Sequence, residues 1–282
     1  MHSKPKQSDL PDDNPDQTGS PLERQDNCGQ KGVTTLTLNR PAQYNALSES
    51  MLAALQTELD DIAKDDSVRV VVLEARGKAF CAGHDLKEMR STYEQPYYDD
   101  LFKRCSRFIQ TLTSLPQPVI AKVHGMATAA GCQLVATCDL AIASTDARFA
   151  VSGVNLGLFC STPSVALSRN IPRKRAFEML FTGDFISAHQ ALDWGLINDC
   201  VSASELDTRV DELCRSICSK PAVAVKTGKE MFYKQLEMPL SDAYKFAGET
   251  MACNMMAGDT LEGIDAFIEQ RKRSWKNDWQ NN

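Results

Sequence analysis

The segment from Val119 to Thr137 constrains the fold more than any other part of the chain. A short apolar strand, Val119–Val123, leads into a turn of small residues that ends at Gly131, and helix-forming residues follow. Small side chains let a ligand approach the backbone closely, and the first amides of a helix have no partner within it. A strand that enters a helix through such a turn can bind an anion or a developing oxyanion. Tight packing of a helix on a sheet explains the same small residues equally well.

A second segment repeats this order earlier in the chain. Val68 to Glu74 is predicted to be a buried strand, and residues 75–89 run through a loop with small residues into an apparent helix. Two such turns can direct two backbone N–H groups at one carbonyl oxygen. Asp85 is expected to cap the helix that begins at Leu86, although its carboxylate is also a candidate base.

The remaining pattern indicates an α/β protein. Apolar spacing and capping residues predict the following elements: strands at 33–38, 139–143 and 197–201, helices at 49–64 (capped by Ser48), 93–115, 163–170, 173–180 and 187–194, an extended segment at 149–158, and only helices after Ser204. Strands that are each followed by a helix favour right-handed parallel ββα turns. We expect a disordered tail at 1–30, which is rich in Pro, Asp, Gln and Ser, a core at 31–203 and a helical region at 204–282.

Composition excludes several classes of partner. The net charge of −6 and the pI of about 5.3 leave no basic footprint for nucleic acid. No run approaches the roughly 18 apolar residues of a membrane-spanning helix. Ten cysteines occur without a Cys-x-x-Cys pair, so we expect no metal site and a reducing compartment. The N-terminal segment lacks the features of a secretory signal or a mitochondrial presequence. We therefore expect a cytoplasmic protein of bacterial type, or one of the mitochondrial matrix if an upstream presequence is missing.

Two segments carry a family resemblance. Residues 77–87, Gly-Lys-Ala-Phe-Cys-Ala-Gly-His-Asp-Leu-Lys, and residues 127–134, Ala-Thr-Ala-Ala-Gly-Cys-Gln-Leu, resemble the oxyanion-hole segments of the crotonase (enoyl-CoA hydratase/isomerase) superfamily in order and spacing. The resemblance runs from about Val33 to about Trp275. It implies a crotonase-type ββα spiral, a helical C-terminal trimerisation region, and homotrimers or dimers of trimers. It also implies an acyl-CoA ligand, with coenzyme A as part of the substrate and no covalently bound cofactor.

The resemblance assigns roles to main-chain groups first. The amides of His84 and Ala130 are expected to polarise the thioester carbonyl, because two preorganised donors stabilise an enolate oxygen. The family also implies that coenzyme A is held by these residues: the main chain from Ala79 to Ala82, Lys87, and, from a neighbouring subunit, Phe267 and the basic run that includes Lys272. A solvated basic helix end explains the charge of Lys272 equally well.

Both carboxylates that hydratases of this family use are missing from their expected positions. One position holds Gln133, an amide that can only orient water or substrate, and the other holds Gly153. The expected substrate pocket contains these residues: Asp85, Gly131, Gly153, Asn155 and Cys160. Cys160 lacks a histidine beside it in sequence, as a nucleophile would require. The His84 ring titrates in a useful range, although the family's tolerance at this position favours a role for the amide alone.

Two functions therefore stay open. One is an enzyme that stabilises a thioester enolate, with decarboxylation, isomerisation or weak hydration as candidate reactions. The other is an acyl-CoA-binding or regulatory protein of fatty-acid metabolism that has lost its chemistry. Hydration gained by a Gln133→Glu, Gly153→Glu double variant would indicate an intact hydratase scaffold.

Overall fold

The computed structural model describes residues 19–27 and 29–275, and two sheets form its centre. Within these residues the larger sheet has six strands in the order β1-β2-β3-β5-β7-β10, and the smaller has four in the order β4-β6-β8-β9. The strands are β1 (Leu22–Asp26), β2 (Val33–Leu38), β3 (Val70–Ala75), β4 (Ala79–Cys81), β5 (Val119–Val123), β6 (Met126–Thr128), β7 (Leu140–Ser144), β8 (Arg148–Ala150), β9 (Ile186–Ser187) and β10 (Asp199–Val201). Most neighbouring strands run parallel; β1 with β2 and β8 with β9 run antiparallel.

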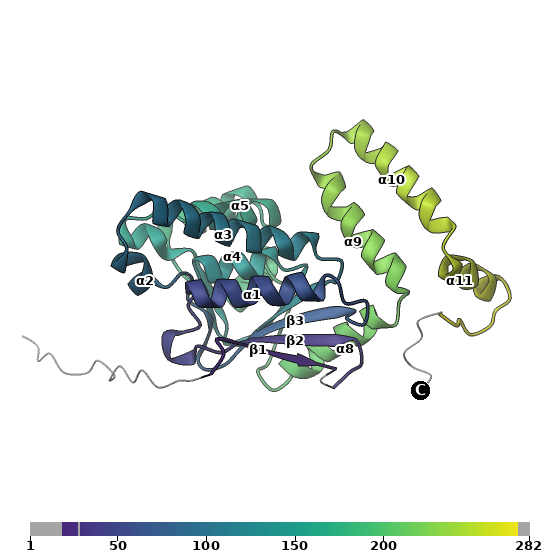
Figure 1. Cartoon of the computed structure of the whole chain (residues 1–282), viewed down its shortest axis with the longest axis horizontal. Coiled ribbons are helices and arrows are strands. Elements are labelled where there is room, and N and C mark those ends of the chain that lie inside the picture. Colours follow the sequence, from purple (N-terminus) through teal and green to yellow (C-terminus); the bar gives the residue numbers. More distant parts are fainter. Residues whose placement is uncertain (1–18, 28, 276–282) are drawn as a thin grey trace, which may run out of the picture.

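Helices surround these sheets (Figure 1). They are α1 (Glu49–Ile62), α2 (Leu86–Ser91), α3 (Gln95–Ser114), α4 (Ala130–Thr137), α5 (Ser161–Asn170), α6 (Arg173–Thr182), α7 (Ala188–Asp193), α8 (Leu206–Cys218), α9 (Ala222–Leu236), α10 (Leu240–Met255) and α11 (Gly258–Ile268), with 3₁₀ turns η1 (Pro41–Gln43) and η2 (Ser152–Leu156).

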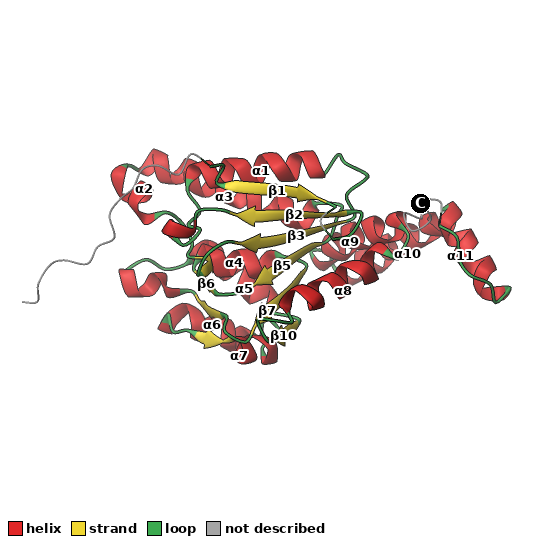
Figure 2. Ribbon diagram, turned by 90° about the horizontal axis from the view of Figure 1, so that it is seen from below, coloured by secondary structure: helices red, strands yellow, loops and turns green. Residues whose placement is uncertain are grey.

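The chain repeats one unit, which confirms the predicted ββα spiral (Figure 2). A strand of the larger sheet leads into a short strand of the smaller sheet and then into a helix: β3-β4-α2, β5-β6-α4, and β7-β8-η2 with α5. Successive side chains on a strand point to opposite faces of the sheet. Helices pack on both sides of the larger sheet, so both of its faces are buried. Val70 and Val72 face Leu206 and Val210 of α8. The alternate side chains, including Leu73, pack into the main core with α1 and α3.

The expectation of a disordered 1–30 tail is wrong for residues 22–26. These residues form β1, which pairs with β2 along its whole length. Leu22 enters the core with 6% of its surface exposed, and the Thr34 hydroxyl donates to Asp26 at 2.6 Å. Pairing with β2, the buried Leu22 and ion pairs from Arg24 to Glu58 and from Glu23 to Arg76 together order this polar segment. Residues 1–18 and Cys28 lie outside the described residues.

The segment from 149 to 158 is also less extended than predicted. Strand β8 stops at Ala150, and η2 follows from Ser152 to Leu156. Gly157 ends this turn with φ of 79°, and the Leu158 amide donates to the Gly153 carbonyl at 3.0 Å. Local hydrogen bonds therefore fold the segment back on itself.

After residue 204 the described chain forms helices only, α8 to α11, and the part that leaves the core begins at α9. Helix α8 covers the larger sheet, whereas α9, α10 and α11 project away from the spiral (Figure 1). Lys229 of α9 is buried and anchors the projection to the core. Its ammonium donates to the carbonyls of Leu112 and Gln117 at 2.8 and 2.9 Å and to the Asp139 carboxylate at 2.6 Å. No helix of the described residues is long and apolar enough to cross a membrane.

Candidate functional site

Three segments meet at one edge of the smaller sheet. Strands β4, β6 and β8 are parallel neighbours, so the residues that follow each of them lie at the same edge. These residues are His84 after β4, Ala130 after β6 and Gly153 after β8. Two hydrogen bonds join the strand ends. The Thr128 hydroxyl donates to the Ala82 carbonyl at 3.0 Å, and the Ala129 backbone amide donates to the Ala150 carbonyl at 2.9 Å.

The two predicted oxyanion turns touch. Gly83 has φ of +94°, and a Cβ placed on it would lie 3.2 Å from the Ala130 amide nitrogen. The next amide along the chain from Gly83 is that of His84. Among the described residues, the amides of His84 and Ala130 donate no hydrogen bond, and Ala130 opens α4, where no intrahelical acceptor exists. Two unused donors therefore lie at adjoining turns.

Ala129 holds a backbone conformation that L-residues rarely adopt. Its φ of 50° and ψ of −120° belong to the region that glycine favours. Such a conformation costs about 1–3 kcal/mol and persists where the surrounding structure imposes it. Here it lies between β6 and α4, so it fixes the direction of the Ala130 amide.

Gly131 brings α4 directly onto β4. A Cβ at this position would overlap the carbonyl oxygen of Cys81, which belongs to β4. The glycine is therefore required for packing, which is the alternative that the sequence left open for the small residues of this turn. The same packing sets the start of α4 against the end of β4.

The His84 ring is shielded. It makes a T-shaped contact with Phe102 from α3, with ring centroids 5.6 Å apart, and in the described part of the chain both ring nitrogens are closed off from solvent without a hydrogen-bond partner. Burial lowers the pKa of His84, and the nearby Leu47 carbonyl opposes this shift only in part. The ring is therefore neutral near pH 7.

The two positions expected to hold carboxylates are both buried. Gln133 is 3% exposed, and its Oε1 atom has no hydrogen-bond partner. A Cβ on Gly153 would lie 2.6 Å from the Cys160 sulfur and 2.5 Å from the Leu158 carbonyl oxygen. Burial raises the pKa of the Cys160 thiol, which leaves it protonated. Asn155 is exposed on η2 and lies against Gly183 at the end of α6.

Asp85 is committed to structure. Its carboxylate caps α2 by accepting from the amides of Lys87 and Glu88 at 3.1 and 3.3 Å. The same carboxylate pairs with the Arg40 guanidinium at 3.2 Å. The predicted cap is therefore confirmed. The Arg40 guanidinium and the two helix amides use the Asp85 carboxylate, so a role as base would compete with these contacts.

The predicted coenzyme A residues fall into two separate groups. The Ala79 carbonyl already accepts from the Asn45 side chain at 2.8 Å, and the Ala82 amide donates to the Tyr44 carbonyl at 3.0 Å. Lys87 is exposed on α2 near these residues.

The second group lies at the other end of the molecule. Phe267 of α11 is 76% exposed, and Lys272 follows that helix on the surface. Figures 1 and 2 place α2 and α11 at opposite ends, so one copy of the chain does not bring the two groups together. Arg271 of the same basic run is occupied by Glu262 in a bidentate pair at 2.6 and 2.9 Å.

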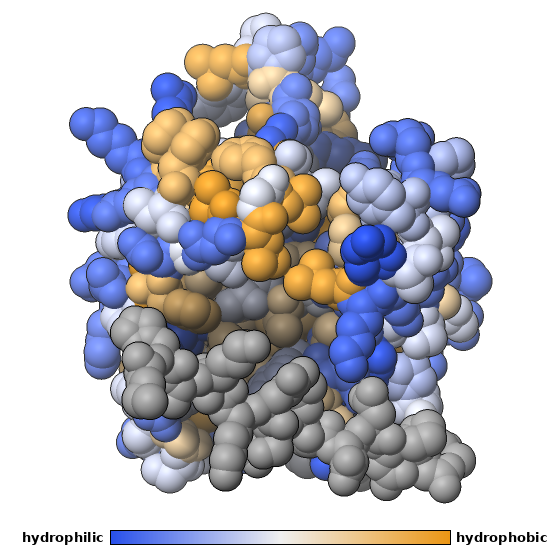
Figure 3. All heavy atoms as spheres, turned by 90° about the vertical axis from the view of Figure 1, so that its left-hand side faces the viewer, coloured by the Kyte–Doolittle hydropathy of each residue, from blue (hydrophilic) through white to orange (hydrophobic). Residues whose placement is uncertain are grey.

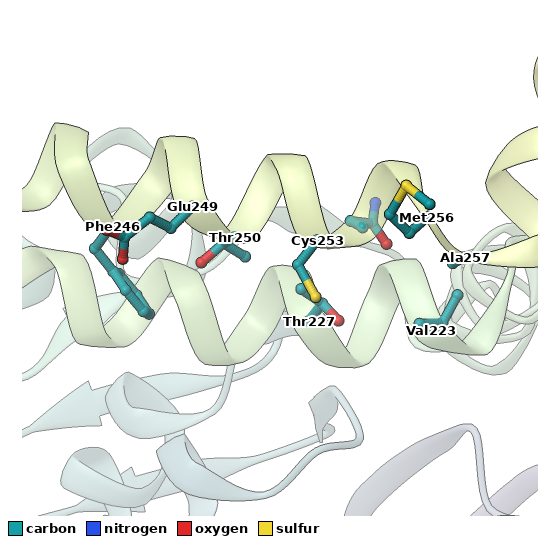
Figure 4. A pocket seen from close by; sticks show the side chains of 9 residues that line it. Val223, Thr227, Phe246, Glu249, Thr250, Cys253, Met256 and Ala257 are labelled. Carbon is teal, nitrogen blue, oxygen red and sulfur yellow. The ribbon is translucent and has the colours of Figure 1, made fainter.

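Apolar surface gathers in two places. On the side of the molecule that carries α2, apolar side chains surround a hollow, with polar groups at the rim (Figure 3). Between α9 and α10 lies a cavity of about 540 Å³, with Val223, Phe246, Cys253 and Met256 among its lining residues (Figure 4). In the described part of the chain no group of three His, Cys, Asp or Glu side chains is placed to hold a metal ion.

Some features of the site gave no signal in the sequence. Phe102 is one of several apolar residues at helical spacing in α3, and nothing distinguishes it before the fold is known. The contact of the Cys160 sulfur with the Gly153 position depends on the turn of η2, which was predicted as extended. The Arg40 partner of Asp85 lies 45 residues away in the chain.

Comparisons with known proteins agree with this architecture. The sequence matches the family model described as enoyl-CoA hydratase/isomerase over residues 29–278. Enoyl-CoA hydratase domain-containing protein 3, mitochondrial, from Xenopus laevis is 46% identical over 87% of this chain and 84% of that protein. A solved enoyl-CoA hydratase from Mycobacterium smegmatis superposes with a TM-score of 0.89 at 56% identity, covering 90% of this chain and 98% of that one. The human enoyl-CoA hydratase domain-containing protein 3 gives a TM-score of 0.87 at 43% identity, covering 90% and 100%.

Proposed function

The chain belongs to the enoyl-CoA hydratase/isomerase family, and on this premise we propose that it binds an acyl-CoA thioester and stabilises its enolate with the backbone amides of His84 and Ala130. One observation carries the proposal: the Gly83 turn lies against the Ala130 amide, and neither the Ala130 nor the His84 amide has a partner within residues 19–27 and 29–275. Family membership supports the thioester as the ligand of these donors.

The stabilisation is electrostatic. When a proton or a carboxyl group leaves the carbon next to a thioester carbonyl, negative charge develops on the carbonyl oxygen. Two amides fixed by β4, β6 and α4 meet that charge without rearranging, and loss of one such donor typically lowers turnover by about 10²–10³-fold. Gly131 and the strained Ala129 hold the geometry on the α4 side.

Ordinary hydration is not the favoured reaction. Gln133 cannot exchange a proton, and the space beside Gly153 is taken by the Cys160 sulfur and the Leu158 carbonyl. A reaction that needs an enolate but no pair of carboxylates, such as decarboxylation or isomerisation, suits this site better. The enzyme would then be a lyase or isomerase that acts on acyl-CoA.

A second candidate function is acyl-CoA binding without turnover, in a regulatory role. The same two positions, Gln133 and Gly153, favour it, since their chemistry is absent while the amides are retained. The two candidates share a ligand and differ in whether a bond breaks.

Calorimetry with butyryl-CoA, followed by turnover assays with crotonyl-CoA and a malonyl-type thioester, separates these functions. Ala130 opens α4, where proline is tolerated, so Ala130→Pro in an Ala129→Gly background removes one donor. Ala129→Gly alone is the matched control, because it relieves the backbone restriction that a following proline imposes. Turnover that drops about 10²–10³-fold in the double variant supports the proposal. Turnover equal to the control, or no butyryl-CoA binding by the unaltered chain, refutes it.

The proposed assembly is a homotrimer or a dimer of trimers. Helix α11, which carries Phe267, and helix α2, which carries Lys87, lie at opposite ends of the molecule, and this supports a shared site formed with another copy. Large apolar side chains are exposed on the projecting helices at Leu240, Tyr244, Met251, Met256, Leu261, Phe267 and Ile268. Burying them against a neighbour removes an apolar surface that monomers rarely expose. The compartment, bacterial cytoplasm or mitochondrial matrix, is proposed from relatives of both kinds.

A further inference from the structure

His84 stands apart from the other ionisable groups at the edge of the smaller sheet. Both nitrogens of its ring are closed off and unpartnered. A buried polar group with no partner is uncommon, and in a native structure it often marks a catalytic role or a ligand contact. The ring belongs to the residue that follows Gly83, whose turn lies against the Ala130 amide, so it is the ionisable side chain nearest in sequence to the proposed oxyanion donors.

The neighbouring acids are all engaged. Asp85 pairs with Arg40 at 3.2 Å and caps α2. Glu88 of α2 accepts from the amide of Glu49 at 2.9 Å.

Two further groups complete this set. The Glu49 carboxylate pairs with Arg104 of α3 at 2.8 Å. The Cys160 thiol is held protonated by burial, which raises its pKa. Among the described ionisable side chains at these turns, the His84 ring has no side-chain partner, and the Leu47 carbonyl is the polar group that acts on it.

We propose that the His84 imidazole is the proton-exchanging group of this site. In the step, a ring nitrogen takes a proton from the carbon next to the thioester carbonyl. The C–H electron pair forms the enolate double bond, and the carbonyl π pair moves onto the oxygen held by the two amides. Return of a proton from the imidazolium to the same carbon restores the thioester, so nothing is oxidised or consumed. This role rests on the proposed acyl-CoA function of the same site.

Access to the ring requires a movement. The ring lies edge-on against Phe102 of α3, although the residue as a whole is only partly buried. Both ring nitrogens are closed off, so proton transfer requires the ring to turn away from Phe102. The charged groups on the surrounding elements, Asp85, Glu88 and Glu49, are each neutralised or capping, and the Leu47 carbonyl is the remaining polar influence on the ring.

Deuterium exchange tests the proposal directly. Butyryl-CoA is saturated and cannot be hydrated, so mass spectrometry in D₂O reports only proton exchange at its α-carbon. His84→Gln keeps the backbone amide and a polar side chain but removes the base. His189→Gln is the matched control, because His189 is exposed on α7, which follows β9 at the edge opposite the ends of β4, β6 and β8. Calorimetry measures butyryl-CoA binding by all three proteins.

The expected result is exchange by the unaltered chain and by His189→Gln, with a loss of about 10²-fold or more in His84→Gln. The exchange rate of the unaltered chain should also fall at acid pH, with an inflection below the ordinary histidine value of 6.5. This inflection decides the matter even if His84→Gln binds poorly.

Three results would overturn the inference. Binding without exchange removes the proton-transfer role and leaves the proposed acyl-CoA function standing. Equal exchange by His84→Gln assigns the step to another group. Failure of the unaltered chain to bind butyryl-CoA removes both the inference and the function on which it rests.

Discussion

At the scale of single residues, the conformation of Ala129 has a measurable cost. Its φ of 50° and ψ of −120° suit glycine, so Ala129→Gly should raise the free energy of unfolding by about 1 kcal/mol. Urea denaturation measures this change. The same substitution at Ala136, inside α4, should instead lower stability by about 1 kcal/mol, because helical glycine is unfavourable. Equal destabilisation by both variants would show that Ala129 is not strained.

The space beside Gly153 can be probed with a double-mutant cycle. Gly153→Ala adds a Cβ that meets the Cys160 sulfur and the Leu158 carbonyl, and overpacking of this kind costs about 1–3 kcal/mol. Cys160→Ala removes the sulfur, so the cost of Gly153→Ala should be smaller in that background. An unchanged cost would assign the crowding to the Leu158 carbonyl alone. A Gly153→Glu change meets the same obstacle, so the Gln133→Glu, Gly153→Glu variant should not gain hydration without Cys160→Ala as well.

The buried His84 ring makes stability depend on pH. Because burial lowers its pKa below 6.5, the unfolded chain binds the proton more readily than the folded chain. The contribution of His84 is therefore favourable above pH 6.5 and is lost as the pH falls toward the folded-state pKa. His84→Gln should flatten the dependence of unfolding free energy on pH between 7.5 and 5, by at most about 1.4 kcal/mol per pH unit. A slope for His84→Gln that is parallel to that of the unaltered chain would contradict the assignment.

At the scale of elements, α9 is tied to the core by Lys229, which pairs with Asp139, and by the Tyr233 hydroxyl, which donates to the same carboxylate at 2.8 Å. Burial lowers the pKa of Lys229, and Asp139 opposes that shift. Lys229→Met would leave the Asp139 carboxylate buried without its cation, which costs about 3–5 kcal/mol. Lys234→Met on the same helix removes only an exposed pair with Glu230 and should cost less than about 1 kcal/mol. Similar losses from both changes in chemical denaturation would show that the buried pair does not anchor α9.

The longer elements could be predicted because their signals are local. Ser48 caps α1 by accepting from the Met51 amide at 3.2 Å, and β5 spans the predicted Val119–Val123. Strand β1 was missed because its order comes from pairing with β2, which composition does not reveal. The strands of the smaller sheet are two or three residues long, too short for a hydrophobic period to appear.

The sequence predicted which backbone turns form the candidate site, but not which side chains surround them. The order of the two turns and their glycines placed the His84 and Ala130 segments correctly as neighbours. The sequence could not show that Phe102 shields the His84 ring or that the Cys160 sulfur fills the space at Gly153, because both contacts depend on how distant segments pack.

At the scale of the whole molecule, the projecting helices predict self-association. Light scattering should give three or six times the chain mass of 31.2 kDa. Met256 is 81% exposed beside the α9–α10 cavity. A Met256→Asp variant places a charge there and should shift the protein toward monomers. Thr208→Asp, at an exposed polar position on α8, should leave the mass unchanged. A monomeric mass for the unaltered chain would refute the proposed assembly.

The proposed donors after β4 and β6 are backbone amides, and this affects how the sequence of such a protein can change. Inheritance changes side chains one codon at a time, whereas an amide at the end of β4 or β6 survives almost any codon that keeps the turn. The side chain at Gln133 can therefore change while the backbone arrangement that Gly83 and Gly131 set stays the same, whereas a change at Gly153 also requires its neighbours to move.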